Sequence, residues 1–187
     1  MILQTHTHVL HDHDLTLRPM TEADWDILLA WNNDPEVLYY AEGDDITSRS
    51  LDDMQAIYRF VSQSGFCFVM EAIGQPVGEC WLQQMNLERI QQKYPHADCR
   101  RIDLMIGEKG LWGQGYGTRT IRLLVRFAFE QERADYVFGC DIADYNLRSQ
   151  KAFQKVGFSL DTTILQSAGG KAQACFDYVL SRADFSS

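Results

Sequence analysis

The 187-residue chain has only four prolines, no cysteine pair at CxxC spacing and no long apolar segment. Its longest wholly apolar run, about Phe66 to Met70, is far shorter than the roughly 20 residues that cross a bilayer, so we expect no membrane partner. The start, Met1 to Gln4, lacks the cationic and apolar regions of a signal peptide. Five scattered cysteines argue against a disulfide framework or a structural zinc site. These absences favour a cytoplasmic protein with reduced thiols.

Basic residues are in deficit, because 17 Lys and Arg stand against 26 Asp and Glu, for a formal charge of −9. A protein that binds nucleic acid by neutralising phosphates needs a basic surface, so this balance argues against that class of partner. The acidic excess either attracts a cationic partner over long range or only keeps the protein soluble.

No linker, repeat or low-complexity stretch divides the sequence, and its length fits one domain over residues 1–187. Four histidines crowd the first 14 residues. A His-x-His pair can hold a metal, but a polar terminus of this kind is typical of a flexible tail, which we expect for residues 1–14.

Apolar residues alternate with period two in some segments and recur with period 3.6 in others, which predicts strands and helices in turn. The predicted strands are 15–18, 66–71, 77–82, 101–106, 136–140, 158–165 and 174–180. The clearest predicted helices are 118–130 and 146–156, and shorter ones begin near Thr21, Asp34 and Ser50. Residues 86–98 are polar and fit either a short helix or a long loop. This order predicts an α/β (α+β) domain whose helices cover a central sheet.

A glycine-rich loop joins the 101–106 strand to the 118–130 helix, with Gly113, Gly115 and Gly117 at alternate positions. Glycines let backbone N–H groups approach a ligand, and a helix N-terminus adds partial positive charge, so the loop suits a pyrophosphate. A tight turn alone would also explain the glycines. The loop is not a P-loop, because no Gly-Lys-Ser/Thr follows it.

A second cluster runs from Asp141 to Ser149 and leads into a helix that ends before Gly157-Phe158. Asn146 stands where this helix begins, and its side chain could cap the helix or hydrogen-bond an amide of a ligand. Several basic residues lie around the two clusters, as expected for a charged nucleotide, although exposed helix faces also collect such charges: Arg119, Arg122, Arg126, Arg148, Lys151 and Lys155.

From about Leu15 to Leu180 the sequence resembles the GNAT superfamily of N-acetyltransferases. The loop from Gly113 to Thr118 is similar to that family's acetyl-CoA pyrophosphate loop, and the segment ending at Gly157-Phe158 is similar to its second cofactor motif. Within the superfamily, the Leu17–Asp24 opening, the Ile102-Asp103 pair and the Asn146-Leu147-Arg148 run resemble the aminoglycoside 6'-N-acetyltransferases. The resemblance implies a mixed, mostly antiparallel sheet of about seven strands flanked by helices.

The resemblance also implies that acetyl-CoA is the cosubstrate and that no metal is needed. Backbone N–H groups of the loop would hold the pyrophosphate, and strand 104–106 would pair with the pantetheine arm. An N–H near Met105 or Ile106 would stabilise the oxyanion of the tetrahedral intermediate. The expected cofactor-binding residues are Leu104, Met105, Ile106, Gly113, Gln114, Gly115, Tyr116, Gly117, Thr118, Asn146 and Phe153.

The acceptor implied by the resemblance is a small cationic amine such as an aminoglycoside. The amine must lose a proton before it attacks the thioester, and Asp103 is the residue expected to accept that proton, directly or through water. An ordinary strand-surface aspartate is the alternative for Asp103, and helix-end packing is the alternative for the two tyrosines. The expected substrate-binding residues are Tyr39, Tyr40, Glu42, Glu79, Asp103, Asp141 and Asp144.

Two positions depart from the family pattern. Trp112 stands where the loop usually has Gln or Arg, which leaves the backbone cradle unchanged. Phe153 stands where many members have a tyrosine that protonates the departing thiolate, and phenylalanine has no hydroxyl. Either water or another donor such as Tyr145 replaces this acid, or none is needed.

The sequence also fits two other functions. Acetylation of a protein N-terminus, as on a ribosomal protein, would need an extended peptide groove. A catalytically idle acyl-CoA sensor would keep the cofactor site without turnover. The sequence leaves regiochemistry open and fits either a monomer or a homodimer.

Overall fold

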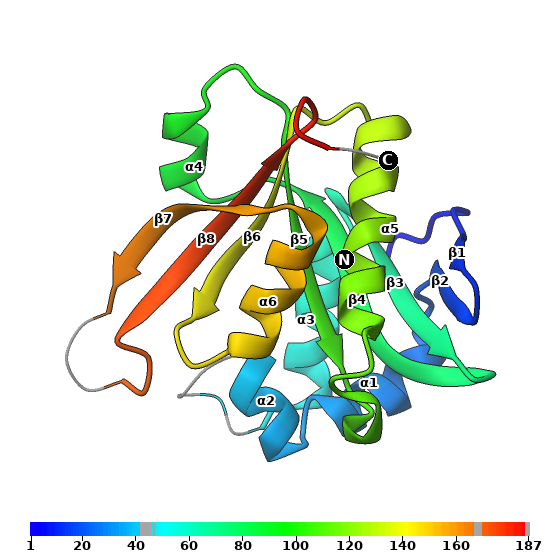
Figure 1. The fold of residues 1–187 in the computed structure, drawn as a ribbon. Helices are drawn as coiled ribbons and strands as arrows, with labels where there is room; N and C mark the ends of the chain where they lie inside the picture. Colours follow the sequence, from blue (N-terminus) through cyan, green and yellow to red (C-terminus); the bar gives the residue numbers. More distant parts are fainter. Residues whose placement is uncertain (42–45, 47, 167–169, 186–187) are drawn as a thin grey trace.

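The computed structural model describes residues 1–41, 46, 48–166 and 170–185. One sheet of eight strands runs through the molecule in the order β1-β2-β3-β4-β5-β6-β8-β7 (Figure 1). All neighbouring strands are antiparallel except β5 and β6, which are parallel. The strands are β1 Leu10–Asp12, β2 Leu15–Pro19, β3 Gly65–Ala72, β4 Gln75–Gln84, β5 Cys99–Ile106, β6 Tyr136–Ala143, β7 Ser159–Leu165 and β8 Ala174–Ser181. The mixed, mostly antiparallel architecture is confirmed, with one strand more than expected.

Helices cover both faces of this sheet. The helices are α1 Trp25–Trp31, α2 Pro35–Ala41, α3 Leu51–Val61, α4 Glu88–Lys93, α5 Tyr116–Glu130 and α6 Leu147–Val156, with 3-10 turns at Glu22–Asp24 and Lys109–Leu111. The ambiguous stretch 86–98 contains α4, whose Ile90 packs beside Phe138. No helix in the described ranges is long and apolar enough to cross a bilayer.

The long helix α5 follows the predicted apolar spacing. Ile121, Leu124, Val125 and Ala128 are all fully buried in the main core, together with residues of β2 to β4 and of α6. Burial of each large aliphatic side chain stabilises the fold by about 1.5–3 kcal/mol. The helix begins at Tyr116, two residues before the predicted start, because Gly115 adopts the left-handed backbone (φ 92°) that precedes it.

The first 14 residues lie against the sheet, so the expectation of a flexible tail is wrong. Leu3 is buried, and the ring of His6 lies 4.5 Å from that of Phe68. A His6 ring nitrogen is 3.0 Å from the carbonyl oxygen of Cys67, and Leu10–Asp12 adds a strand to β2. Burial of Leu3 and the pairing of Leu10–Asp12 with β2 hold this segment in place.

Candidate active site

Strands β5 and β6 separate halfway along their length. Their pairing ends where Ile102 meets Gly139, whereas β5 stays paired with β4 as far as Ile106. Figure 1 shows the two strands diverging toward their carboxyl ends. Among the residues that the structure describes, no strand therefore lies beside the edge of β5 over residues 103–106 on the β6 side. A strand edge of this kind offers backbone N–H and C=O groups to a ligand that lies along it.

Gly139 makes room for an aromatic ring at the point of separation. A Cβ atom added to Gly139 would lie 2.5 Å from the Phe153 ring, so no larger residue fits without a shift. Phe153 is 2% exposed and packs edge-on against Phe158 with ring centroids 5.0 Å apart. The buried ring of Phe153 forms part of the cavity wall. Because a phenyl ring has no donor or acceptor atom, it contributes no polar group.

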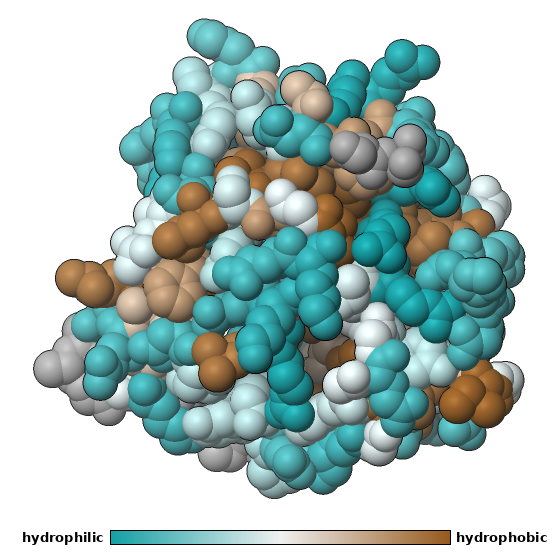
Figure 2. All heavy atoms as spheres, viewed as in Figure 1, coloured by the Kyte–Doolittle hydropathy of each residue, from teal (hydrophilic) through white to brown (hydrophobic). Residues whose placement is uncertain are grey.

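A groove of about 300 Å³ lies on one side of the open edge, between α2, α6 and the glycine loop. The α5 N-terminus opens into it, and Gly113 and Gly115 have left-handed backbones (φ 78° and 92°). In Figure 2 the surface is hollowed here, between hydrophilic side chains of α6 and paler loop residues. Three cations of α6 line the groove, namely Arg148, Lys151 and Lys155. Helix N-terminus and cations together suit a multiply charged anion.

The side chain of Arg148 rests on two aromatic rings at the groove. Its guanidinium carbon lies 4.2 Å from the ring centroid of Tyr40 and 4.2 Å from that of Trp112. The indole N–H of Trp112 donates to the carbonyl oxygen of Ile106 at 2.8 Å. Trp112 thus ties the loop to β5 and supports a guanidinium from α6.

A cavity of about 890 Å³ lies on the other side of the open edge, toward α3. Leu104 and Met105 line both this cavity and the groove, so the two spaces meet at β5. Charged side chains in the cavity wall are Arg49, Glu79, Arg101, Asp103 and Asp141. Among the predicted residues, Tyr40 and Asn146 also line both spaces, and Phe153 lines the cavity.

Asp103 borders the cavity and is held by two neighbours. Arg101 donates to both of its oxygens, at 2.6 and 2.8 Å, and the indole N–H of Trp81 donates at 2.9 Å. An ionised carboxylate accepts about four hydrogen bonds, so these three leave a site for a ligand. The Asp103 side chain remains 24% exposed, which keeps that site accessible.

Asp141 lies on β6 and lines the cavity from the side opposite β5, and its backbone conformation is unusual. Its φ is +54°, a left-handed value that aspartate adopts more readily than most residues. One carboxylate oxygen lies 2.7 Å from the guanidinium of Arg89, and the side chain is 47% exposed. Glu79 also lines the cavity and is 4% exposed.

Two of the predicted acceptor residues that the structure describes do not line the cavity. The carboxylate of Asp144 accepts the backbone N–H groups of Gln173 and Ala174 at 3.0 and 3.1 Å, which anchors the start of β8. Tyr39 packs against Tyr145 with ring centroids 4.9 Å apart. The contacts of Asp144 and of Tyr39 are therefore structural and do not point to a ligand. Glu42 lies outside the described residues.

Two predicted loop residues contribute no side chain to the groove. Gln114 donates its side-chain amide to the carbonyl of Gly110 at 2.7 Å. Tyr116 is buried in the core, and its hydroxyl donates to Asp14 at 2.8 Å. Arg119, expected near the cofactor, instead pairs with Asp12 and Asp14 beside β1. Gln114 and Tyr116 therefore have only backbone N–H groups to offer.

Asn146 caps α6, which is one of the two roles that the sequence predicts for it. Its Oδ1 accepts the backbone N–H of Ser149 at 3.2 Å, and its Nδ2 donates to the carbonyl of Tyr40 at 2.9 Å. The second bond ties α6 to the end of α2. A contact between Asn146 and a cofactor amide stays a prediction.

The thiols near the site are poor nucleophiles. Burial raises the pKa of Cys140 well above its ordinary value, although nearby Arg101 partly offsets this. Burial also raises the pKa of Cys175, the half-buried cysteine of the cavity wall. Both stay protonated near neutral pH, and a thiol attacks far more slowly than a thiolate.

In the part of the chain that the structure describes, no group of three or more His, Cys, Asp or Glu is arranged to hold a metal.

Sequence reasoning missed two features of the site. Gly139 carried a signal, because a glycine inside a strand often marks a close approach by another group. The pair Arg89 and Asp177 carried none, since 88 residues separate them, and helix α4 and strand β8 become neighbours only through the fold.

The family model described as acetyltransferase (GNAT) domain matches residues 14–159. Two curated relatives named aminoglycoside N(6')-acetyltransferase type 1, from Klebsiella pneumoniae and Serratia marcescens, are each 24% identical over 160 residues. These alignments cover 83% of this chain and 79% of each relative.

Solved structures share the fold. Aminoglycoside acetyltransferase AAC(6')-Ib in complex with ribostamycin and coenzyme A has a TM-score of 0.75 at 23% identity, over 91% of this chain and 95% of that one. Spermidine N-acetyltransferase from Vibrio cholerae in complex with CoA and spermine has a TM-score of 0.75 at 17% identity, over 92% and 98% of the two chains.

Proposed function

Because the chain belongs to the GNAT family of acetyltransferases, we propose that it transfers the acetyl group of acetyl-CoA to an amine of a polycationic small molecule. The acceptor that we favour is the 6'-amine of an aminoglycoside. The curated relatives named above support this choice, since their names state that activity and the match extends over most of both chains.

The observation that carries the proposal is the open edge of β5 with a space on either side of it. Residues 103–106 have no strand partner on the β6 side within the described ranges, and Leu104 and Met105 line both spaces. A thioester in the groove and an amine in the cavity would meet at this edge. Such placement turns an encounter of two substrates into a reaction within one complex.

The groove supplies what acetyl-CoA needs. Backbone N–H groups of the loop and the α5 N-terminus would bind the pyrophosphate, with Arg148, Lys151 and Lys155 adding positive charge. The amide-rich pantetheine arm would pair with β5 as an added strand. An N–H of β5 near Met105 or Ile106 would then stabilise the oxyanion that forms on the thioester carbonyl.

In this mechanism the acceptor amine attacks the thioester carbon directly. Asp103 accepts the proton that the ammonium group loses, directly or through one water. The tetrahedral intermediate then collapses, the C–S bond breaks and the electron pair leaves with the CoA sulfur. A water molecule carries the remaining excess proton of the attacking nitrogen to that thiolate, because buried Phe153 offers no proton. The raised pKa of Cys140 and Cys175 supports direct transfer over an acyl-cysteine intermediate.

Thiol release from acetyl-CoA tests the proposal. We would compare kanamycin and tobramycin with spermine and with a panel of peptides, each at saturating acetyl-CoA. Thiol release with the aminoglycosides, and mass spectra showing one acetyl group at the 6'-amine, would support it. Turnover with peptides alone, or CoA binding without turnover of any amine, would contradict it.

The same proposal assigns the enzyme to aminoglycoside resistance in the cytoplasm. All five cysteines are free, which supports a reducing compartment. Expression in a susceptible bacterium should raise the minimal inhibitory concentration of kanamycin, and the Asp103→Asn variant should not.

A further inference from the structure

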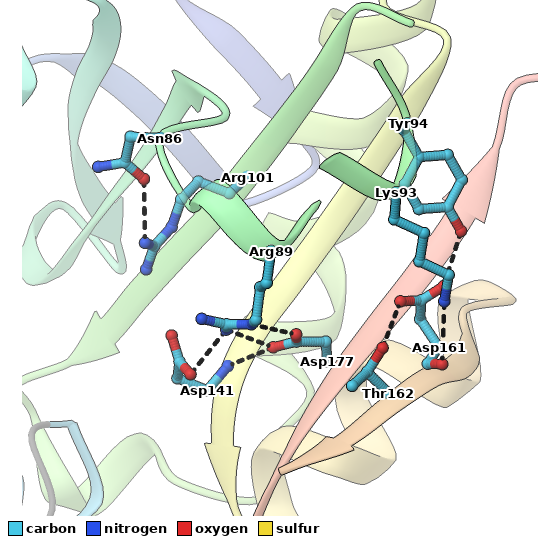
Figure 3. A network of polar contacts seen from close by, with 9 residues as sticks. All are labelled: Asn86, Arg89, Lys93, Tyr94, Arg101, Asp141, Asp161, Thr162 and Asp177. Atoms are coloured by element: carbon cyan, nitrogen blue, oxygen red, sulfur yellow. Dashed lines mark hydrogen bonds and ion pairs between the residues drawn. The ribbon is translucent and has the colours of Figure 1, made fainter. Parts of the chain in front are cut away.

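Two separate polar networks attach α4 to the C-terminal strands, as Figure 3 shows. In one, Arg89 reaches Asp177 on β8 and Asp141 on β6. In the other, Lys93 and the adjoining Tyr94 reach Asp161 on β7, at 2.8 and 2.7 Å. Only the first network touches a residue of the cavity wall, namely Asp141.

Arg89 is bound chiefly by a buried carboxylate. Its Nε and Nη2 donate to the two oxygens of Asp177, both at 2.9 Å, and the Asp177 side chain is 0% exposed. Bidentate charged pairs of this kind have fixed geometry, and removing one partner would leave a buried charge uncompensated. Nη2 of the same guanidinium also donates to Oδ1 of Asp141 at 2.7 Å. Arg89 is therefore a rigid bridge between the two aspartates.

Asp177 also holds the backbone of Asp141. The N–H of Asp141 donates to Oδ1 of Asp177 at 3.0 Å, at the point where the register between β6 and β8 shifts. A non-glycine residue in the left-handed region is strained and persists only where its surroundings enforce that conformation. Asp177 enforces it at the backbone, and Arg89 enforces it at the side chain.

The contacts of Arg89 with the two aspartates leave one net negative charge and, among the described residues, one free carboxylate oxygen at the cavity. Two carboxylates and one guanidinium sum to one negative charge. Within the described part of the chain, Oδ2 of Asp141 accepts no hydrogen bond, while Oδ1 is bound to Arg89. Asp177 is fully buried, so the exposed share of this charge lies on Asp141.

We propose that Arg89, together with Asp177, positions Asp141 so that its second carboxylate oxygen binds an ammonium group of the acceptor. Arg89 is thus a positioning residue that acts on the acceptor side alone. The inference rests on the proposed function, because it assigns an ammonium to the cavity. Its structural half, the fixation of Asp141, can be tested without any substrate.

Amide hydrogen exchange at Asp141 tests the fixation. The variant Arg89→Gln should speed this exchange at least roughly tenfold, the equivalent of one lost hydrogen bond. Lys93→Gln is the matched control, since it weakens the second attachment of α4 and leaves Asp141 untouched. Equal acceleration in both variants, or none in Arg89→Gln, would overturn the positioning role.

Steady-state kinetics with kanamycin test the binding half. Arg89→Gln should raise the KM for kanamycin about tenfold, with kcat and the KM for acetyl-CoA within about threefold, because one charged hydrogen bond is lost. Arg89→Lys should restore part of the loss and serves in place of Arg89→Gln if that variant folds poorly. A fall in the KM for kanamycin would show that Arg89 competes with the amine and would overturn the proposal.

A double variant separates this inference from the proposed function. If Arg89 acts through Asp141, adding Arg89→Gln to Asp141→Asn should raise the KM no further, because coupled residues are not additive. Additive effects would overturn the inference alone. Absence of thiol release with kanamycin in the unmodified enzyme would overturn the proposed function, while the exchange experiment would still decide the fixation of Asp141.

Discussion

The carboxylate of Asp103 accepts two hydrogen bonds from the guanidinium of Arg101, which stands two positions earlier on the same strand. The two side chains lie on one face of β5 because alternate residues of a strand point the same way. The pair forms part of the cavity wall, and Trp81 on the neighbouring strand fixes it further. Asp103 is thus held at the open edge before any substrate binds.

The variant Asp103→Asn should lower kcat/KM for kanamycin more than tenfold, since general base catalysis is typically worth about 10²–10⁴. The amide cannot accept the ammonium proton, while the groove stays intact. Acetyl-CoA affinity, measured by calorimetry, should therefore change little. The control Trp81→Phe removes one donor and keeps the carboxylate. Normal activity in Asp103→Asn would remove Asp103 from the mechanism.

The variant Phe153→Tyr should leave kcat within about tenfold of the original, because acid catalysis accelerates a reaction only where it is used. The added hydroxyl would enter a buried position beside Gly139 and Phe158. Pre-steady-state and steady-state thiol release would measure the change. A gain of several hundredfold would show instead that protonation of the thiolate limits the natural enzyme.

The variant Arg148→Ala should raise the KM for acetyl-CoA about tenfold, because a guanidinium at the groove is lost along with its stacking on Tyr40 and Trp112. Arg126→Ala is the control, since Arg126 is exposed and pairs only with Glu130 among the described residues. The KM for kanamycin should change in neither variant. Equal effects of the two substitutions on acetyl-CoA would point to overall charge and contradict a local role.

Asp24 should make the stability of the protein sensitive to acid. Burial of Asp24 disfavours its charged form, but hydrogen bonds from Arg18 and Thr21 outweigh burial and hold its pKa below the ordinary value. A lowered pKa in the folded state contributes stability above the ordinary pKa of about 4, and this contribution is lost as the pH falls below it.

The variant Asp24→Asn measures that contribution. Its free energy of unfolding in urea at pH 7 should be about 1–3 kcal/mol smaller, the usual cost of leaving a buried charged partner unsatisfied. The difference from the unmodified protein should shrink as the pH falls from about 4 toward 2. A constant difference over that range would contradict the role of the Asp24 charge.

Local patterns predicted the elements that bury one regular face. The spacing of Ile121, Leu124, Val125 and Ala128 was sufficient for α5, since each of them reaches the core. The sequence left residues 86–98 open between a short helix and a long loop, because Ile90 is the only buried residue of α4. Its attachment depends on ion pairs with strands far along the chain.

Several predicted residues line the two spaces, but the sequence did not show which way each side chain of the site turns. The glycines of the loop face the groove as expected, but the side chain of Tyr116, one position before Gly117, enters the core. Successive helix residues are about 100° apart, so a loop pattern does not tell which side chains turn toward the ligand. The role of Asp144 could not be predicted for a similar reason. Its carboxylate accepts the backbone N–H groups of residues 173 and 174, which are distant in the sequence and come near only in the folded chain.

Leu104 and Met105 stand in the walls of both spaces, so this part of β5 works as a partition between two compartments. In the proposed reaction, acetyl-CoA would occupy the groove and the amine the cavity, and the two would meet at this edge. A bound acetyl-CoA would cover that edge and complete the wall that the amine meets. Turnover should then be sequential, with the cosubstrate arriving first and the free thiol leaving last.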